Sequence, residues 1–190
     1  MTALSASATL GGGFADPARD AAQAFRAVLD AMARPGTKVT LAAAHGPAPL
    51  SPAAAAVLLT LVDRTTPLHL AGAHDGAALR DWIAFHCGAP LVAAEDAAFA
   101  LGTWAALQPL DRFAIGTPEY PDRSATLIVD DPAEGQPVTL SGPGIRGTAA
   151  ALLPDPTAFA ANHARFPLGW DAILTRGAAL IAVPRSSEVR

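Results

Sequence analysis

Capped helices that alternate with short apolar segments set the strongest limit on the fold of this chain. Asp16 and Ser51 are each followed directly by a proline, which is the arrangement typical of a helix N-cap and its first helical residue. Apolar segments too short for helices follow the helical ones, and they end at glycine or proline breaks. We therefore predict early helices at 17–34, 52–63 and 75–88, the last with Asp75 as its cap, and early strands at 37–41, 67–71 and 90–94.

The second half of the chain is richer in strands. We predict strands at 125–131, 138–142, 171–175 and 179–184, with the last two paired through a short link that suits antiparallel strands. Early helix–strand alternation combined with late strand pairs predicts an α/β layered fold with a mixed sheet. The small, polar and glycine-rich residues 1–12 are expected to form a disordered tail, followed by a single α/β domain at 13–190.

The first two helices differ in the distribution of their apolar residues. In the first helix, five apolar residues fall on one face at helical spacing, and we expect that face to cover the sheet: Ala18, Ala22, Phe25, Leu29 and Met32. The second helix is apolar nearly all round, so we expect it to be buried. The apolar surface that these helices leave without a partner in the chain predicts a twofold dimer.

Composition excludes several classes of protein. Charged residues make up 16% of the 190 residues and the net charge is -4, which argues against a nucleic-acid-binding protein with its basic patch. The N-terminal residues lack a charged segment followed by an apolar one, and no stretch of 18 apolar residues occurs, so neither a secretory signal nor a membrane span is expected. These features predict a cytoplasmic protein.

The segment GPGIRG at 142–147 matches the glycine spacing of a dinucleotide-binding fingerprint. A true fingerprint needs a helix that begins at the third glycine, but Pro154 and Pro156 stop the following segment too early. Pro143 also removes a backbone N–H that would donate to phosphate. We therefore interpret Gly142, Pro143 and Gly144 as a tight turn between two strands, with both glycines in conformations open mainly to glycine.

Metal ligation and nucleophilic catalysis find little support. The five histidines lack the spacing that places two ligands on one helical face: His45, His69, His74, His86 and His163. Cys87 is the single cysteine, which excludes an intrachain disulfide and is explained as well by apolar burial as by catalysis. No G-x-S-x-G elbow is present. No metal is expected in this chain.

Arginines are the candidates for anion recognition, because the guanidinium fork binds two oxygens of a phosphate at once. The candidates are Arg26, Arg34, Arg123, Arg146 and Arg185. For each of them, a surface or structural role is the alternative. Asp63 and Asp171 lie at the ends of segments that we expect to be buried, and a structural ion pair with an arginine is the simplest role for either acid.

Six segments, taken in order, resemble the family of H subunits of the bacterial carbon–phosphorus lyase system (PhnH). They span residues 12–187 and are GGFADPARDAAQAFRAVLDAMARPG at 12–36, LLTLVDRTTPL at 58–68, GTPEYPDRSATLIV at 116–129, LSGPGI at 140–145, FPLGWDAIL at 166–174 and VPRSS at 183–187. Each segment alone is a weak signal, but six in family order are specific. Residues 70–112 carry no motif of the family.

The resemblance implies a three-layer α/β/α sandwich with a mixed sheet, similar to the fold of pyridoxal-phosphate transferases. It implies a homodimer in isolation and a core complex with the G, I and J subunits. With G, I and L, the family is tied to the reaction in which ATP loses adenine and methylphosphonate is attached to the ribose, giving ribose 1-methylphosphonate 5-triphosphate. The J subunit later cleaves the carbon–phosphorus bond with an iron–sulfur cluster. No catalytic residue carries over, and GPGI is a signature turn of the family.

Two roles stay open at this point. The subunit either contributes arginines to a shared site for ATP and phosphonate, or it is a structural and docking subunit without chemistry of its own. In neither case is it expected to be active alone. A pyridoxal-phosphate enzyme would need a Schiff-base lysine. The one lysine, Lys38, lies at the start of a short strand, so no pyridoxal phosphate is expected.

Overall fold

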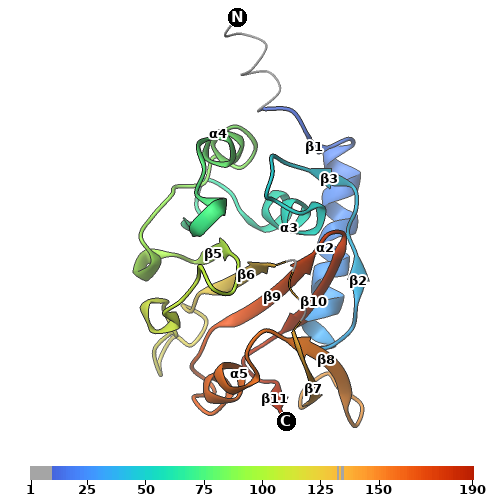
Figure 1. Ribbon diagram of the computed structural model, residues 1–190, viewed down its shortest axis with the longest axis vertical. Coiled ribbons are helices and arrows are strands. Elements are labelled where there is room, and N and C mark those ends of the chain that lie inside the picture. The colour runs from blue at the N-terminus through green and yellow to red at the C-terminus, as the bar shows by residue number, and fades with distance from the viewer. Residues whose placement is uncertain (1–9, 132, 134) are drawn as a thin grey trace, which may run out of the picture.

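A six-stranded mixed sheet forms the centre of the molecule (Figure 1). The computed structural model describes residues 10–131, 133 and 135–190, and within them the strand order is β2-β10-β9-β6-β5-β4. Strands β4, β5, β6 and β9 are parallel, whereas β10 is antiparallel to both of its neighbours. The strands are β2 (Val39–Thr40), β4 (Leu68–Leu70), β5 (Phe99–Gly102), β6 (Thr126–Asp130), β9 (Asp171–Arg176) and β10 (Ala179–Val183). The predicted mixed α/β sheet and the antiparallel pair near the C-terminus are confirmed.

Two smaller sheets accompany the central one. A three-stranded antiparallel sheet has the order β11-β7-β8, and a short pair joins β1 to β3. Their strands are β1 (Gly13–Phe14), β3 (Ala44–His45), β7 (Gln136–Ser141), β8 (Ala149–Leu153) and β11 (Glu188–Val189). Strands β7 and β8 enclose the GPGIRG segment, as predicted.

Two of the three predicted helices begin at their predicted caps. The α-helices are α2 (Pro17–Ala33), α3 (Pro52–Leu61), α4 (Ala77–His86) and α5 (Pro156–His163), and the short 3-10 helices are η1 (Gly72–His74), η2 (Ala94–Asp96) and η3 (Leu110–Arg112). The side chains of Asp16 and Ser51 accept hydrogen bonds from the first turns of α2 and α3. The predicted Asp75 cap is wrong: Gly76 is the N-cap of α4, and the Asp75 carboxylate instead accepts a hydrogen bond from Arg80 Nε at 2.6 Å.

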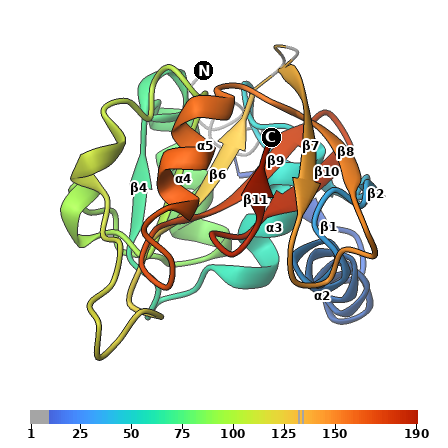
Figure 2. The ribbon, with the colours of Figure 1, turned by 90° about the horizontal axis from the view of Figure 1, so that it is seen from below.

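Side chains on the two faces of the central sheet belong to two separate cores. One core joins α2, α3 and α4 to the sheet and includes Ile128 and Ile173, while the other joins α5 and the β7–β8 sheet to the opposite face and includes Leu127 and Ala172. Figure 2 shows α2 and α3 on one side of the central strands and α5 on the other. The second outer layer therefore combines a small sheet with a helix, rather than helices alone.

The buried face of α2 differs from the predicted face. The buried residues are Ala24, Val28 and Ala31, whereas Phe25 and Leu29 remain 49% and 54% exposed. Small side chains allow α2 to approach α3 and β10 closely, which explains why the alanine-rich face, and not the bulky one, is turned inward. Helix α3 is buried over Ala53–Leu58, as predicted.

Strand β5 was not predicted from the sequence, and neither was the longer helix α5. The four residues of β5, FALG, lie between two parallel strands, and pairing with β4 and β6 holds them there. The predicted strand at 90–94 is reduced to one bridge between Leu91 and Leu68. A short segment with alanine and glycine has little intrinsic strand preference, so its state is decided by the sheet around it.

The N-terminal tail falls mainly outside the described residues, which begin at Leu10. Residues 10–12 lie beside α4, where His86 Nε2 donates a hydrogen bond to the Leu10 carbonyl oxygen at 3.1 Å. Among the helices of the described residues, none has the length and apolar character needed to cross a membrane.

Candidate functional site

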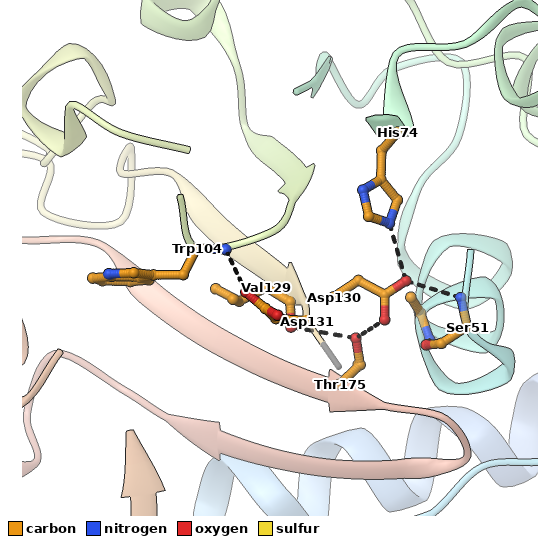
Figure 3. Close-up of polar contacts among 8 residues, drawn as sticks. Ser51, His74, Trp104, Val129, Asp130, Asp131 and Thr175 are labelled. Atoms are coloured by element: carbon orange, nitrogen blue, oxygen red, sulfur yellow. Dashed lines mark hydrogen bonds and ion pairs between the residues drawn. The ribbon is translucent and has the colours of Figure 1, made fainter. Parts of the chain in front are cut away.

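A buried polar cluster lies at the carboxyl end of β6, centred on Asp130 (Figure 3). Its carboxylate accepts hydrogen bonds from the Ser51 backbone N–H at 2.8 Å, from His74 Nε2 at 3.2 Å and from Thr175 Oγ1 at 2.9 Å. These donors come from the N-terminus of α3, from η1 and from β9. The cluster therefore holds the N-terminus of α3 and the 3-10 helix η1 against the middle of the central sheet.

Asp130 remains ionised in this environment, although burial opposes its charge. Burial alone would raise the pKa of the Asp130 carboxyl, but the hydrogen bonds from His74, Ser51 and Thr175 outweigh burial and lower that pKa below its ordinary value. The N-terminus of α3 adds a favourable field, because helix N-termini attract negative charge. Asp130 is thus a buried carboxylate whose negative charge is compensated by donors of the same chain.

The cluster is closed to solvent. Asp130 is 4% exposed and His74 is 2% exposed, and His74 Nδ1 is buried without a hydrogen-bond partner among the described residues. A substrate cannot reach these atoms while the cluster is closed. We interpret Asp130 and His74 as positioning groups that fix α3 and η1 against the sheet.

A groove with a volume of about 610 Å³ lies beside the cluster, between the β9–β10 pair and the β7–β8 sheet. Thr175 belongs to both places, since it lines the groove and donates to Asp130. On the other side of the groove, the Asp131 carboxylate accepts from the Trp104 backbone N–H at 3.1 Å, and the Trp104 ring stacks on Phe159 with centroids 5.5 Å apart. The walls are therefore fixed by hydrogen bonds and ring packing.

The lining of the groove is mainly aliphatic. It includes Leu152 from β8, Leu174 from β9 and Ile181 from β10, whereas its charged members are Lys38, Asp131 and Arg176. A triphosphate carries several negative charges and is usually held by several cations or helix N-termini. The groove is better suited to an apolar surface than to a triphosphate.

The arginine candidates for anion binding are spread over separate elements, and none of the five lines the groove. Arg34 pairs with Asp30 at 2.7 Å on the surface of α2, and the guanidinium of Arg123 lies 4.1 Å from the ring centroid of Tyr120. Arg26 lies exposed on α2, and Arg146 lies exposed in the turn between β7 and β8. Among the described residues, no group of three histidine, cysteine or acidic side chains could hold a metal ion.

Arg185 is engaged with the chain itself. It forms a two-pronged ion pair with Asp171, with Nε and the second guanidinium nitrogen donating at 3.1 and 2.6 Å, and it also donates to the Pro121 carbonyl oxygen at 2.6 Å. The contact with Pro121 brings it to the loop that carries Arg123. The ion pair expected for Asp171 is thus present, and it occupies most donors of Arg185.

Asp63 differs from the expectation of a buried, paired acid. It is exposed, and its carboxylate accepts from the backbone and hydroxyl of Thr65 and from the hydroxyl of Thr66, which lowers its pKa. The reason is that α3 ends at Leu61, so Asp63 already lies in the following turn, where aspartate commonly bonds to nearby backbone groups.

The GPGIRG segment is a turn against the end of α2. Gly142 and Gly144 have φ values of 123° and 79°, as predicted for glycine-only conformations. A Cβ atom on Gly144 would collide with the carbonyl oxygen of Ala33, the last residue of α2. The segment after the third glycine continues into strand β8 instead of a helix, so the dinucleotide fingerprint is excluded.

Sequence reasoning missed the polar cluster, although one signal pointed to it. Asp130 and Asp131 end the apolar segment ATLIVDD, and polar residues at the carboxyl ends of parallel strands often mark functional positions. The partners of Asp130 could not be found in this way, because His74 and Ser51 lie 56 and 79 residues away in the sequence.

Comparison with known proteins identifies the family of this chain. The family model described as bacterial phosphonate metabolism protein (PhnH) matches residues 12–190. A relative from Rhizobium meliloti (strain 1021), named alpha-D-ribose 1-methylphosphonate 5-triphosphate synthase subunit PhnH, is 44% identical to the chain over 190 residues, which covers 94% of each protein. A family match over nearly the whole chain leaves one conclusion: the chain belongs to the PhnH family of bacterial phosphonate metabolism proteins.

Proposed function

We propose that this chain is a subunit of an α-D-ribose 1-methylphosphonate 5-triphosphate synthase and acts in the breakdown of organic phosphonates. The supporting observation is the 44% identity to the Rhizobium meliloti subunit over 94% of both chains. In the reaction, the ribose triphosphate of ATP is transferred to methylphosphonate and adenine is released. The chain supports this transfer as part of an assembly.

The geometry favours a supporting and docking role over catalysis by this chain alone. The one buried acid–histidine pair, among the described residues, is closed to solvent, and the open groove beside it is mainly aliphatic. Arg34, Arg123 and Arg185 already contact groups of the chain. Arg26 and Arg146 are the exposed arginines that remain candidates for a shared ATP and phosphonate site completed by partner subunits.

The proposal includes the wider properties that the family resemblance implies. The chain forms a homodimer in isolation, joins the G, I and J subunits in a core complex, and works in the cytoplasm without nucleic acid. Its fold is a variant of the three-layer sandwich of pyridoxal-phosphate transferases, with β7 and β8 sharing one outer layer with α5.

We further propose that pyridoxal phosphate is not a cofactor of this chain. Lys38 lines the groove, but the phosphate of the cofactor would also need an anion site. Helix α5 starts two residues after the lining residue Pro154, and the Asp155 carboxylate already caps its N-terminus, 3.1 Å from Ala158 N. An aldimine absorption band that disappears in Lys38→Ala would contradict this.

Reconstitution tests the proposed function. The other subunits of the synthase are mixed with ATP and methylphosphonate, with and without this chain, and released adenine is measured by chromatography. We expect no adenine from the chain alone and release from the mixture only when the chain is present. Release by the isolated chain, or an equal rate without it, would refute the supporting role.

A further inference from the structure

Helix α2 carries a second apolar stripe that is turned away from the sheet. Phe25 and Leu29 directly follow the buried residues Ala24 and Val28, and one residue along an α-helix corresponds to a rotation of about 100°. The second stripe therefore lies beside the buried face of α2 and not on it. It consists of four exposed residues, which we call the α2 stripe: Ala18, Ala22, Phe25 and Leu29.

No described residue covers the α2 stripe. Helix α2 packs against α3, β1, β2 and β10 and lies at the periphery of the molecule in both views (Figures 1 and 2). Among the large apolar side chains that are exposed in the described residues, Phe25 and Leu29 are the two that share one helix. Residues four apart are neighbours on a helix surface, so these two side chains form one continuous apolar surface.

The spacing of the stripe indicates what kind of structure can cover it. Its residues follow one another at intervals of four, three and four, which is the spacing of the apolar seam in a coiled coil. Such a seam stays in contact with a second helix along its length, because the two helices cross at only about 20°. Ala18 and Ala22 let that helix approach closely, and Phe25 and Leu29 can insert between its side chains. The spacing therefore favours an α-helix as the occupant.

Two arginines flank the stripe on the side away from the buried face. Arg19 and Arg26 each follow a residue of the stripe by one position, and both are exposed. Neither guanidinium forms an ion pair with another described residue. The acid one turn beyond Arg26 is Asp30, which is paired with Arg34 at 2.7 Å. Charges that flank an apolar seam select the partner helix by opposite charge.

These arginines disfavour a second copy of α2 as the occupant. In an antiparallel pair around a twofold axis, Arg19 and Arg26 of both copies would lie on the same side of the interface, where like charges repel. A helix with carboxylates at the facing positions would instead form charge-assisted hydrogen bonds with them.

We infer that the α2 stripe binds an amphipathic helix of a different protein, with an apolar seam flanked by glutamate or aspartate. This surface is separate from the groove and from the polar cluster, so the inference goes beyond the proposed function.

A pair of synthetic peptides tests the inference. The acidic peptide has about three heptads, with leucine at both seam positions and glutamate at both flanking positions, and the control peptide has lysine in place of each glutamate. Like charges on the flanks oppose self-pairing of either peptide. Fluorescence anisotropy of the labelled peptides measures binding to the full chain. We expect the acidic peptide to bind about tenfold more tightly or better. Equal affinities, or no binding of the acidic peptide, would overturn the inference.

Truncation of one apolar side chain locates the binding surface. Phe25→Ala should weaken binding of the acidic peptide by about tenfold, because it removes a large apolar contact. Phe85→Ala is the matched control, since Phe85 is 64% exposed but lies on α4. Alanine is the best helix former, so both variants should keep their helices, and circular dichroism checks this. Unchanged binding by Phe25→Ala would place the peptide elsewhere and overturn the inference.

Charge reversal tests the flank of the stripe. Arg26→Glu should lower the preference for the acidic peptide over the lysine peptide by about fivefold. Arg34→Glu makes the same change of charge at the C-cap of α2, outside the stripe, and should leave the preference unchanged. A preference that persists in Arg26→Glu would overturn the predicted charge of the partner.

A second copy and a membrane surface are the competing occupants. Ala22→Cys should give little covalent dimer under mild oxidation; the wild type is the control, because burial raises the pKa of its partly buried Cys87 thiol to about 11. Efficient crosslinking would assign the stripe to a second copy and overturn the inference. Sedimentation of the wild type, but not of Phe25→Ala, with phosphatidylglycerol vesicles would assign it to a membrane and also overturn it. Adenine release by the reconstituted synthase is measured separately, so failure of the proposed function and failure of this interface are distinguishable.

Discussion

Replacing Asp130 with alanine should remove a large part of the stability of the chain. The carboxylate accepts three hydrogen bonds in the interior, and alanine would leave the Ser51 backbone N–H and His74 Nε2 without their acceptor. Deleting one member of a buried charged cluster typically costs about 3–5 kcal/mol in the free energy of unfolding. A domain of this kind has a total of about 5–15 kcal/mol, so the variant should be close to the limit of folding.

Thr175→Val gives a graded version of the same test. Valine keeps the shape of the side chain and removes one hydrogen bond to Asp130, without leaving a new unpaired donor. A hydrogen bond to a charged group is worth about 1.5–3 kcal/mol, so the loss should be smaller than for Asp130→Ala. Asp81→Ala is the control on the exposed surface of α4, where a change within about 0.5 kcal/mol is expected.

Urea unfolding followed by circular dichroism measures these differences, and thermal unfolding checks them. A loss of 3–5 kcal/mol corresponds to a drop in melting temperature of roughly 6–20 °C for a chain of this size. If Asp130→Ala lost less than about 1 kcal/mol, the cluster would not hold α3 and η1 to the sheet. The closed cluster would then be free for another role, and its function would have to be reconsidered.

Three further predictions follow from other contacts. The pKa of Asp130 is lowered in the folded state. Its contribution to stability is therefore present above the pKa of an unfolded aspartate, about 3.9, and is lost as the pH falls through the lower folded pKa. Urea titrations between about pH 2.5 and 6 should show a steeper loss of stability on acidification in the wild type than in Asp130→Asn. Gly144→Ala should cost more stability than Gly147→Ala, because both glycines have φ near 80° but only the Cβ at 144 collides with a backbone oxygen; equal urea midpoints would contradict the close packing on α2. Arg185→Lys should lower the free energy of unfolding by about 1–3 kcal/mol, because the two-pronged ion pair with Asp171 is lost. Adenine release by the reconstituted enzyme should be retained. A stable variant without activity would instead identify Arg185 as an anion-binding residue.

Local signals in the sequence predict the elements that local physics controls. The side chains of Asp16 and Ser51 form their caps because a cap needs contacts only within one helical turn. The antiparallel pair of β9 and β10 is joined by a short turn, so sequence neighbours become neighbours in space. Glycine at 142 and 144 is required by the backbone conformation itself.

Elements that depend on partners distant in the sequence were missed or misplaced, because local signals do not identify such partners. Strand β5 exists because β4 and β6 pair with it on either side, and nothing in its four residues requires a strand. The orientation of α2 depends on how closely α3 and β10 approach it, and periodicity alone could not choose between two apolar stripes on an alanine-rich helix. The partners of Asp130 come from three segments separated by 45–79 residues.

The distribution of polar and apolar groups also explains why such a chain would work in an assembly. Asp130 has its charge satisfied by donors inside the molecule, so it adds to stability and offers nothing to a substrate. Apolar side chains such as Phe25, Leu29 and Leu152 are instead about half exposed. In an isolated enzyme, one expects polar groups to converge in an open pocket and apolar groups to be covered. Here the polar cluster is closed and the groove beside it is mainly aliphatic, which suits a subunit whose partners complete the chemistry.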